Sequence, residues 1–192
     1  MVTRLALDEE SPGSIPGPAA KFMNRIKVFA DGYLVFGDKT YRCAIGRGGL
    51  VENKKEGDGA TPMGCFPIRR LLYRADKISK PESVFETSPI TKNDGWSDDV
   101  TDPDYNTQVK LPYAYSHEKL WREDNIYNIV VILGYNDDPP IAGKGSAIFM
   151  HIARSNYSRT AGCIALSEED LRDILATVSK NTYVCCPPSA KV

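Results

Sequence analysis

Short β-prone runs, separated by glycine and aspartate, constrain the fold of this chain more than any other feature. Three of them follow one another near the N-terminus, and Asp31-Gly32 and Gly37-Asp38 between them are typical of hairpin turns. Further runs recur along the rest of the chain and include a continuous β-branched segment typical of a buried strand. The expected strands are residues 26–29, 33–36, 39–45, 64–72, 128–135, 146–152, 163–166 and 181–187.

A single segment has helical periodicity. Ser167, followed three residues later by Asp170, is similar to a capping box, and apolar residues then recur with the spacing of one helix face. The sequence therefore predicts a mainly β fold with one C-terminal helix, in a single domain over residues 25–188. Residues 1–24 are rich in Ser, Pro, Gly and acidic residues without periodicity, and we expect a flexible arm there.

A long region without clear periodicity interrupts the expected strands. Residues 76–128 combine Pro, Asp, Asn and aromatic residues, so we expect an irregular excursion from the domain. Loops of this length are usually functional, and this one is expected to form a wall of a binding cleft. Its aspartates lack the spacing of a calcium-binding EF-hand loop, which favours solvated turns.

Charge and cysteine content exclude some classes of function. Lys and Arg number 24 against 25 Asp and Glu, so no strong field attracts nucleic acid or anionic lipid. No apolar run predicts a membrane span or a secretory signal, which indicates a cytoplasmic protein as the sequence stands, or a periplasmic one if its true N-terminus differs or export is non-classical. Five cysteines without C-x-x-C spacing argue against a disulfide framework and favour a reducing compartment.

The candidate site lies in "HIARSNYSRTAGCIAL", residues 151–166. His151 ends an expected strand, and a short polar loop returns the chain to Cys163, so the two side chains are expected to be neighbours. An imidazole beside a thiol can hold the sulfur as the nucleophilic thiolate. The alternative is a strand-end histidine and a buried cysteine acting as a small apolar residue. A zinc site on the same pair is disfavoured, because there are only two histidines and no paired ligand motif.

The residues around the pair could complete a catalytic site. Gly162 permits an uncommon backbone conformation, and the N–H groups of residues 161–163 could bind a developing oxyanion. No carboxylate or amide nearby is placed to orient the imidazole, so the main-chain carbonyl of Ile152 is the expected partner of His151.

These residues resemble the L,D-transpeptidase catalytic domain family, of the YkuD or ErfK type. The family pattern of a strand-borne His and a Ser/Thr-x-Gly-Cys segment corresponds to His151 and to Thr160, Ala161, Gly162 and Cys163. Its upstream Thr-Pro-x-Gly-x-Phe pattern corresponds to residues 61–66, so the resemblance covers roughly residues 25–186. It implies a β-sandwich that needs no metal or organic cofactor. Cys163 would attack an L,D-linked amide of a peptidoglycan stem peptide, with His151 as general base, and pass the resulting thioester to an amine or water.

Two departures from the family bear on substrate binding. Many members have a second His where this chain has Ala161, and an Arg or Asn where it has Ala165. The candidates for substrate binding are therefore Thr160 and Ala161 beside the nucleophile, and Arg154, Arg159 or Arg122 as the replacement charge.

Three functions remain open: a transpeptidase, a hydrolase of the same fold acting on peptidoglycan fragments, and a catalytically silent module that binds wall peptides. The oligomeric state is also open.

Overall fold

The structure is a computed structural model that describes residues 24–188. The arm expected over residues 1–24 therefore lies outside the described residues, except for its last residue. The elements are β1 (Arg25–Val28), β2 (Tyr33–Phe36), β3 (Lys39–Arg42), β4 (Leu50–Val51), β5 (Thr61–Pro62), β6 (Gly64–Tyr73), β7 (Thr87–Pro89), β8 (Asp94–Ser97), β9 (Gln108–Lys110), β10 (His117–Lys119), β11 (Ile129–Leu133), β12 (Phe149–Ile152), β13 (Ile164–Leu166), α2 (Glu168–Thr177) and β14 (Tyr183–Cys186).

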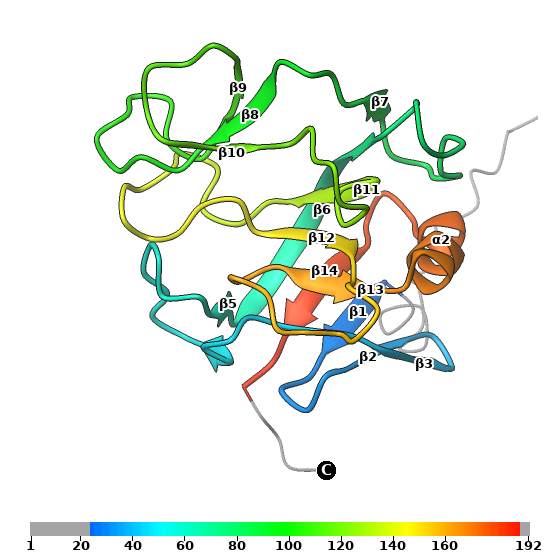
Figure 1. Ribbon diagram of the computed structural model, residues 1–192. Helices are drawn as coiled ribbons and strands as arrows, with labels where there is room; N and C mark the ends of the chain where they lie inside the picture. The colour runs from blue at the N-terminus through cyan, green and yellow to red at the C-terminus, as the bar shows by residue number, and fades with distance from the viewer. Residues whose placement is uncertain (1–23, 189–192) are drawn as a thin grey trace, which may run out of the picture.

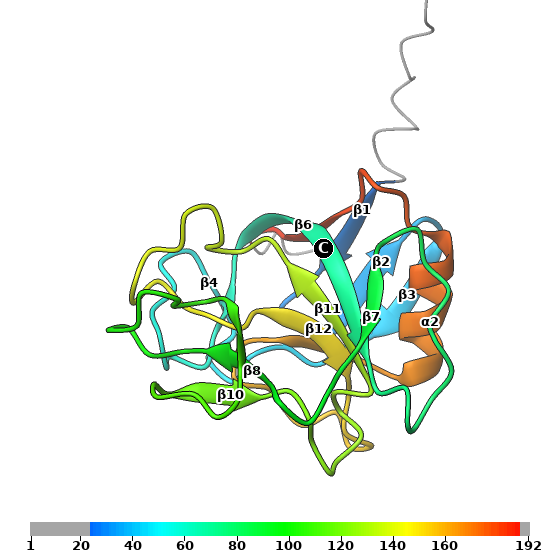
Figure 2. The ribbon, with the colours of Figure 1, turned by 90° about the horizontal axis from the view of Figure 1, so that it is seen from above.

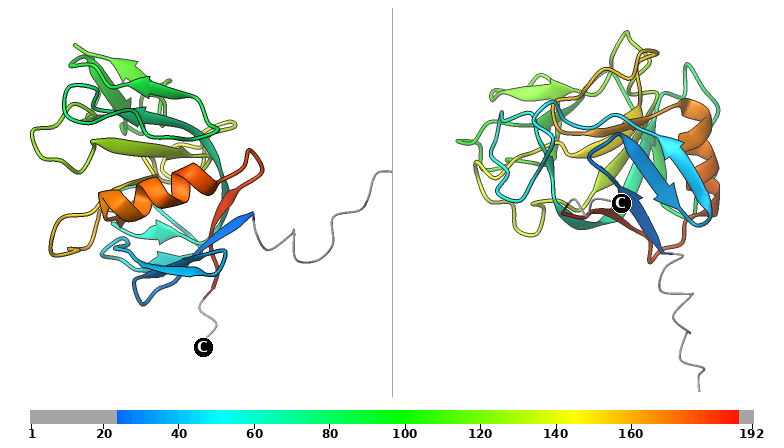
Figure 3. Two further views of the ribbon diagram at one scale, coloured as in Figure 1. Left: turned by 90° about the vertical axis from the view of Figure 1, so that its right-hand side faces the viewer. Right: turned by 90° about the horizontal axis from the view of Figure 1, so that it is seen from below.

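One large sheet organises the molecule (Figure 1). Eight of its nine strands run in the order β13-β12-β11-β6-β14-β1-β2-β3, and β7 pairs with β6. The N-terminal strands β1–β3 lie at one end of the molecule, and the separate sheet β10-β8-β9 lies at the other (Figure 3). The mainly β fold with one helix near the C-terminus confirms the predicted fold class and is consistent with a YkuD-like β-sandwich.

The two faces of β12 and β13 meet different partners. Side chains alternate along a strand, so Met150 and Ile164 face one way and enter the core that also contains Leu171 and Ile174 of α2. Phe149 and Cys163 belong to a second cluster. Figure 2 shows α2 and the β8–β10 sheet on opposite sides of β11 and β12. The large sheet is thus covered by the helix on one face and by the excursion on the other.

Helix α2 begins where the sequence predicts. The Ser167 hydroxyl accepts a hydrogen bond from the backbone N–H of Asp170 at 3.0 Å, and Leu171, Ile174 and Leu175 are buried. The helix ends at Thr177, and Val178 caps it in an extended conformation. The apolar stripe therefore outlasts the helix by one residue, and Val178 still packs in the core.

The excursion over residues 76–128 is more ordered than its sequence pattern indicates. It contains β7–β10, and the indole N–H of Trp96 donates to the side-chain oxygen of Asn106 at 2.9 Å. The Trp96 ring meets the Phe149 ring edge-on, with centroids 4.9 Å apart. This contact fastens the excursion to the large sheet through a buried aromatic pair.

The cysteines depart from the sequence-based expectation. A disulfide joins Cys65 on β6 to Cys185 on β14, although 120 positions separate them in the sequence. These residues are directly opposite each other in the antiparallel pairing of the two strands. Strand register brings them together, which local spacing cannot reveal. Cys43, Cys163 and Cys186 are buried free thiols.

Candidate active site

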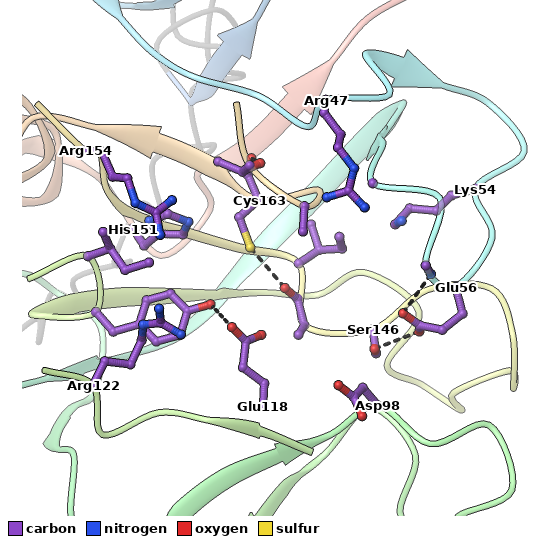
Figure 4. A pocket seen from close by; sticks show the side chains of 18 residues that line it. Arg47, Lys54, Glu56, Asp98, Glu118, Arg122, Ser146, His151, Arg154 and Cys163 are labelled. Carbon is purple, nitrogen blue, oxygen red and sulfur yellow. Dashed lines mark hydrogen bonds between the residues drawn. The ribbon is translucent and has the colours of Figure 1, made fainter. Parts of the chain in front are cut away.

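A cavity of about 300 Å³ lies between β12–β13 and the excursion. His151 and Cys163 line it from the large sheet, as Figure 4 shows. The excursion contributes Asp98, Glu118, Arg122, Ile126 and Tyr127, which confirms the expectation that it forms a wall of a cleft. The loops on either side of β4 add a third wall, which includes Arg47, Lys54, Glu56, Gly57 and Gly59.

His151 is held in the form that a general base requires. Its Nδ1 lies 2.9 Å from the carbonyl oxygen of Ile152, the predicted partner. A carbonyl can only accept, so Nδ1 carries the proton and a neutral ring leaves Nε2 as the acceptor. Burial lowers the pKa of His151 to about 4, which keeps the ring neutral at pH 7. The Tyr127 ring packs edge-on against the imidazole, with centroids 5.3 Å apart.

Cys163 is a protonated thiol in this structure. Its Sγ donates a hydrogen bond to the carbonyl oxygen of Ala147 at 3.1 Å, and no hydrogen bond joins it to His151. Burial, with a smaller contribution from the charge of Glu118, raises the pKa of Cys163 to about 12. At that value about one thiol in 10⁵ is ionised at pH 7. Burial therefore outweighs any stabilisation of the anion by His151, and the resting sulfur fits the alternative of a buried, protonated cysteine.

Gly162 and Thr61 join the two sequence motifs in space. Gly162 has φ +144°, and a Cβ there would lie 2.9 Å from the carbonyl oxygen of Ala60. The buried Thr61 hydroxyl donates to the carbonyl of Gly162 at 2.7 Å and accepts from the N–H of Gly46 at 2.9 Å. The upstream motif thus fixes the backbone immediately before the cysteine, and only glycine fits there without strain.

Thr160 shapes the turn that carries the cysteine. Its hydroxyl accepts from the N–H of Gly162 at 3.1 Å and donates to the carbonyl of Cys163 at 2.6 Å. The N–H of Gly162 is therefore engaged and is not available to an oxyanion, contrary to expectation. The N–H groups of Ala161 and Cys163 are the remaining candidates, and exposed Ala161 lines the cavity.

The arginines divide between two places. Arg122 and Arg154 line the Cys163 cavity, whereas Arg159 lines a separate cavity with Arg42 and Tyr157. The expectation that Arg159 contacts substrate beside Cys163 is therefore wrong. The short loop from His151 turns this side chain toward β2 and β3, a direction that proximity in sequence does not reveal.

Ala165 occupies the position where many family members have an arginine or asparagine, and here this position does not face the cavity. It is 1% exposed, lies opposite His151 in the parallel pairing of β12 and β13, and exchanges two backbone hydrogen bonds of 2.8 Å with Ala44. The residue is enclosed by backbone on both sides and does not line the cavity.

Several polar cavity residues were missed by the sequence analysis. The Tyr127 hydroxyl donates to a carboxylate oxygen of Glu118 at 2.5 Å, and burial raises the pKa of Glu118. Arg47, Lys54 and Asp98 also line the cavity. These residues follow no motif. The expected cleft wall over residues 76–128 was the only signal for Asp98, Glu118 and Tyr127, and no signal pointed to Arg47 or Lys54. His117, the other histidine, lies on β10 and does not line the cavity.

The described part of the chain was also searched for metal and membrane features. Within residues 24–188 no group of three or more His, Cys, Asp or Glu side chains is arranged to hold a metal ion. None of the helices in that range is long and apolar enough to cross a membrane.

The fold and the cavity together define a mainly β domain whose cysteine and histidine share one face of two paired strands. The family profile of the YkuD L,D-transpeptidase catalytic domain matches residues 23–187. The chain belongs to this family, whose members act on peptidoglycan. No curated protein and no solved structure matches the chain significantly.

Proposed function

We propose that this protein is a cysteine-dependent L,D-transpeptidase that acts on peptidoglycan stem peptides. The observation that carries the proposal is the state of His151. Its Nδ1–H is committed to the Ile152 carbonyl, so Nε2 is a free acceptor beside the cavity that Cys163 also lines. A neutral base and a thiol that line one cavity are the minimum set for acyl transfer through a thioester.

The resting hydrogen bond of the thiol determines how the first step begins. Substrate entering the cavity displaces Sγ from the Ala147 carbonyl, and Nε2 of His151 removes the thiol proton as Sγ attacks the amide carbon. The carbonyl oxygen becomes an oxyanion, for which the N–H groups of Ala161 and Cys163 are the candidate donors. The imidazolium then protonates the leaving nitrogen as the C–N bond breaks, leaving the thioester on Cys163.

The second step reverses the roles of the same groups. An incoming amine or water loses a proton to Nε2 of His151 while it attacks the thioester carbon. The C–S bond breaks, and the imidazolium returns the proton to the sulfur. Burial raises the pKa of the thiol and lowers the pKa of the imidazole, so in this mechanism proton transfer to His151 accompanies the attack by sulfur.

We further propose that the protein functions in an oxidising compartment such as the periplasm. The Cys65–Cys185 disulfide supports this location, since such bonds persist outside the reducing cytoplasm. Peptidoglycan is assembled outside the cytoplasm, so the proposed substrate fits the same compartment.

Mass spectrometry of purified muropeptides after incubation with the protein tests the proposed function. Joined stem peptides are the expected result. The intact mass of the wild-type protein should also show an added acyl group, and the Cys163→Ala variant should not carry this group. Trimmed stem peptides would instead identify a hydrolase of the same fold. Unchanged muropeptides and an unmodified protein would contradict both enzymes and favour the silent binding module.

A further inference from the structure

Two side chains in the Cys163 cavity carry charges that the described part of the protein does not neutralise. Arg47 makes no ion pair and no side-chain hydrogen bond within residues 24–188, and neither does Asp98. Other charged residues of the cavity do have partners. Lys54 contacts Asp58 at 2.6 Å, Arg122 contacts Asp124 at 2.8 Å, and Glu56 accepts from the Ser146 hydroxyl at 2.7 Å. One free cation and one free anion therefore face the same cavity.

The structure provides room for the Arg47 side chain. Its backbone N–H donates to the carbonyl of Thr160 at 2.9 Å, which fastens residue 47 to the turn that carries the cysteine. The guanidinium passes over Gly59, where a Cβ would lie 2.8 Å from Cζ of Arg47. Figure 4 shows the side chain extending into the cavity from the side of that turn. Arg47 is thus an exposed cation whose backbone is fixed beside the turn that carries the nucleophile.

Asp98 approaches from the opposite wall. Its Oδ1 is fully buried and has no hydrogen-bond partner, a costly arrangement for a carboxylate oxygen. The residue as a whole is half-buried and lines the cavity, so the rest of the carboxylate can face a ligand. Glu118 lies on the neighbouring strand, opposite Trp96, so alternation places Glu118 and Asp98 on the same face of the small sheet. Figure 4 shows both carboxylates across the cavity from Arg47, with the Cys163 sulfur between the two walls.

The order of charges along a peptide substrate matches the positions of Arg47 and Asp98 on opposite walls of the cavity. The C-terminal carboxylate of a stem peptide belongs to the residue that leaves when the last amide is broken. An ammonium group on the other side of that amide must come from the side chain of the residue that donates the acyl group. The sulfur attacks the carbon between the two residues, so the two charges should lie on opposite sides of Cys163.

We propose that Arg47 and Asp98 are specificity-determining residues that bind opposite charges of one substrate. Arg47 binds the carboxylate of the leaving residue, and Asp98, with Glu118 beside it, binds a side-chain ammonium on the acyl residue. This inference rests on the proposed function and assigns the substrate charges to particular side chains.

Four synthetic tetrapeptides with an L,D-linked last amide test the assignment. The third residue carries a side-chain amine that is free or acetylated, and the fourth ends in a carboxylate or an amide. We expect each modification to lower kcat/KM of the wild type about tenfold to a hundredfold, the usual range for a charge-assisted contact. Arg47→Gln should remove only the preference for the carboxylate, and Asp98→Asn only the preference for the free amine.

Matched variants control for the loss of charge itself. Arg42→Gln removes a cation that lines the other cavity, and Glu123→Gln removes a carboxylate of the excursion that lies outside the Cys163 cavity. Both should keep both preferences of the wild type. If Arg47→Gln or Asp98→Asn instead lowers kcat/KM equally on all four peptides, the residue is structural and the inference is overturned.

Failure of the inference can be separated from failure of the proposed function. A wild-type enzyme that processes all four peptides equally well retains the function and overturns the inference. If no peptide is processed, calorimetric binding of the same four peptides to Cys163→Ala decides. If the affinity falls with each charge removed from the peptide, the assignment is supported although no reaction is observed. If the affinity is the same for all four peptides, the assignment is overturned.

Discussion

The two faces of β12 and β13 are covered in different ways. On one face, Met150, Ile152, Ile164 and Leu166 pack into an apolar core with α2. On the other face, Phe149 and Cys163 pack with aromatic residues of the excursion, and His151 and Cys163 border a cavity with charged walls. The same short strands therefore contribute to the main core on one side and to the candidate site on the other.

This difference shows how the fold can accommodate a costly site. Polar groups buried on the cavity face lose solvation, and the unpaired Asp98 oxygen is an example. The helix face contributes apolar burial without such losses, at about 25 cal/mol per Å². Substitutions on the cavity face should mainly change activity, and substitutions on the helix face should mainly change stability.

The largest expected effect is on the cavity face. His151→Ala removes the proposed base and should lower kcat/KM by about 10²- to 10⁴-fold on a muropeptide substrate, the usual contribution of general acid–base catalysis. His117→Ala is the control, because His117 does not line the cavity and should leave kcat/KM nearly unchanged. Similar losses in both variants would break the assignment of roles to the two histidines.

On the helix face, Leu171→Ala tests the opposite half of the comparison. Leu171 is fully buried, so the change should lower the free energy of unfolding by about 2–5 kcal/mol in urea denaturation. Activity per folded molecule should stay near that of the wild type. Cys163→Ala should cost less stability while abolishing turnover. A large loss of turnover in folded Leu171→Ala would show that the two faces are not separable.

The buried imidazole should also make stability depend on pH. The pKa of His151 is about 4 in the folded protein and near 6.5 when unfolded, so the unfolded chain binds more protons between these values. Stability is therefore present above pH 6.5 and lost as the pH falls toward 4, by about 3 kcal/mol between pH 7 and pH 4. Urea denaturation of the wild type and His151→Gln at both pH values measures this contribution. If the free energy of unfolding changes with pH equally in the two proteins, the contribution of His151 is excluded.

The smallest expected effect separates two arginines of the same loop. Arg154 lines the cavity but is exposed and lies 3.7 Å from Asp124, so Arg154→Ala should lower kcat/KM by at most about tenfold. Arg159→Ala should leave kcat/KM unchanged, because Arg159 lines the other cavity. Steady-state kinetics on one muropeptide can compare them directly. A larger loss in Arg159→Ala would contradict the position that the structure gives this side chain.

Local sequence patterns predicted much of the fold. The run at residues 128–135 contains β11, and Ser167 caps α2 as expected, because β-branching, helical spacing and capping act over a few residues. The short strands of the excursion were missed. They pair mainly with one another, and each has too few residues to show a period.

The candidate site was predictable where motifs carry it. Family resemblance pointed to His151, Cys163 and the Ile152 carbonyl, and the structure brings the two side chains to one cavity. The direction of a long exposed side chain does not follow from its place in the chain, so Arg47 was missed and Arg159 was misplaced. The sequence also left the protonation of Cys163 open, because it depends on burial by residues distant in sequence.

The hydrogen bond from Thr61 to Gly162 has a consequence for the order in which the molecule is assembled. It joins backbone segments 101 residues apart, so it can form only after most of the chain has been synthesised and has collapsed. The cysteine turn receives its final geometry through this long-range contact. We therefore expect a nascent or partly folded chain to carry Cys163 in a conformation that is unsuited to the proposed reaction.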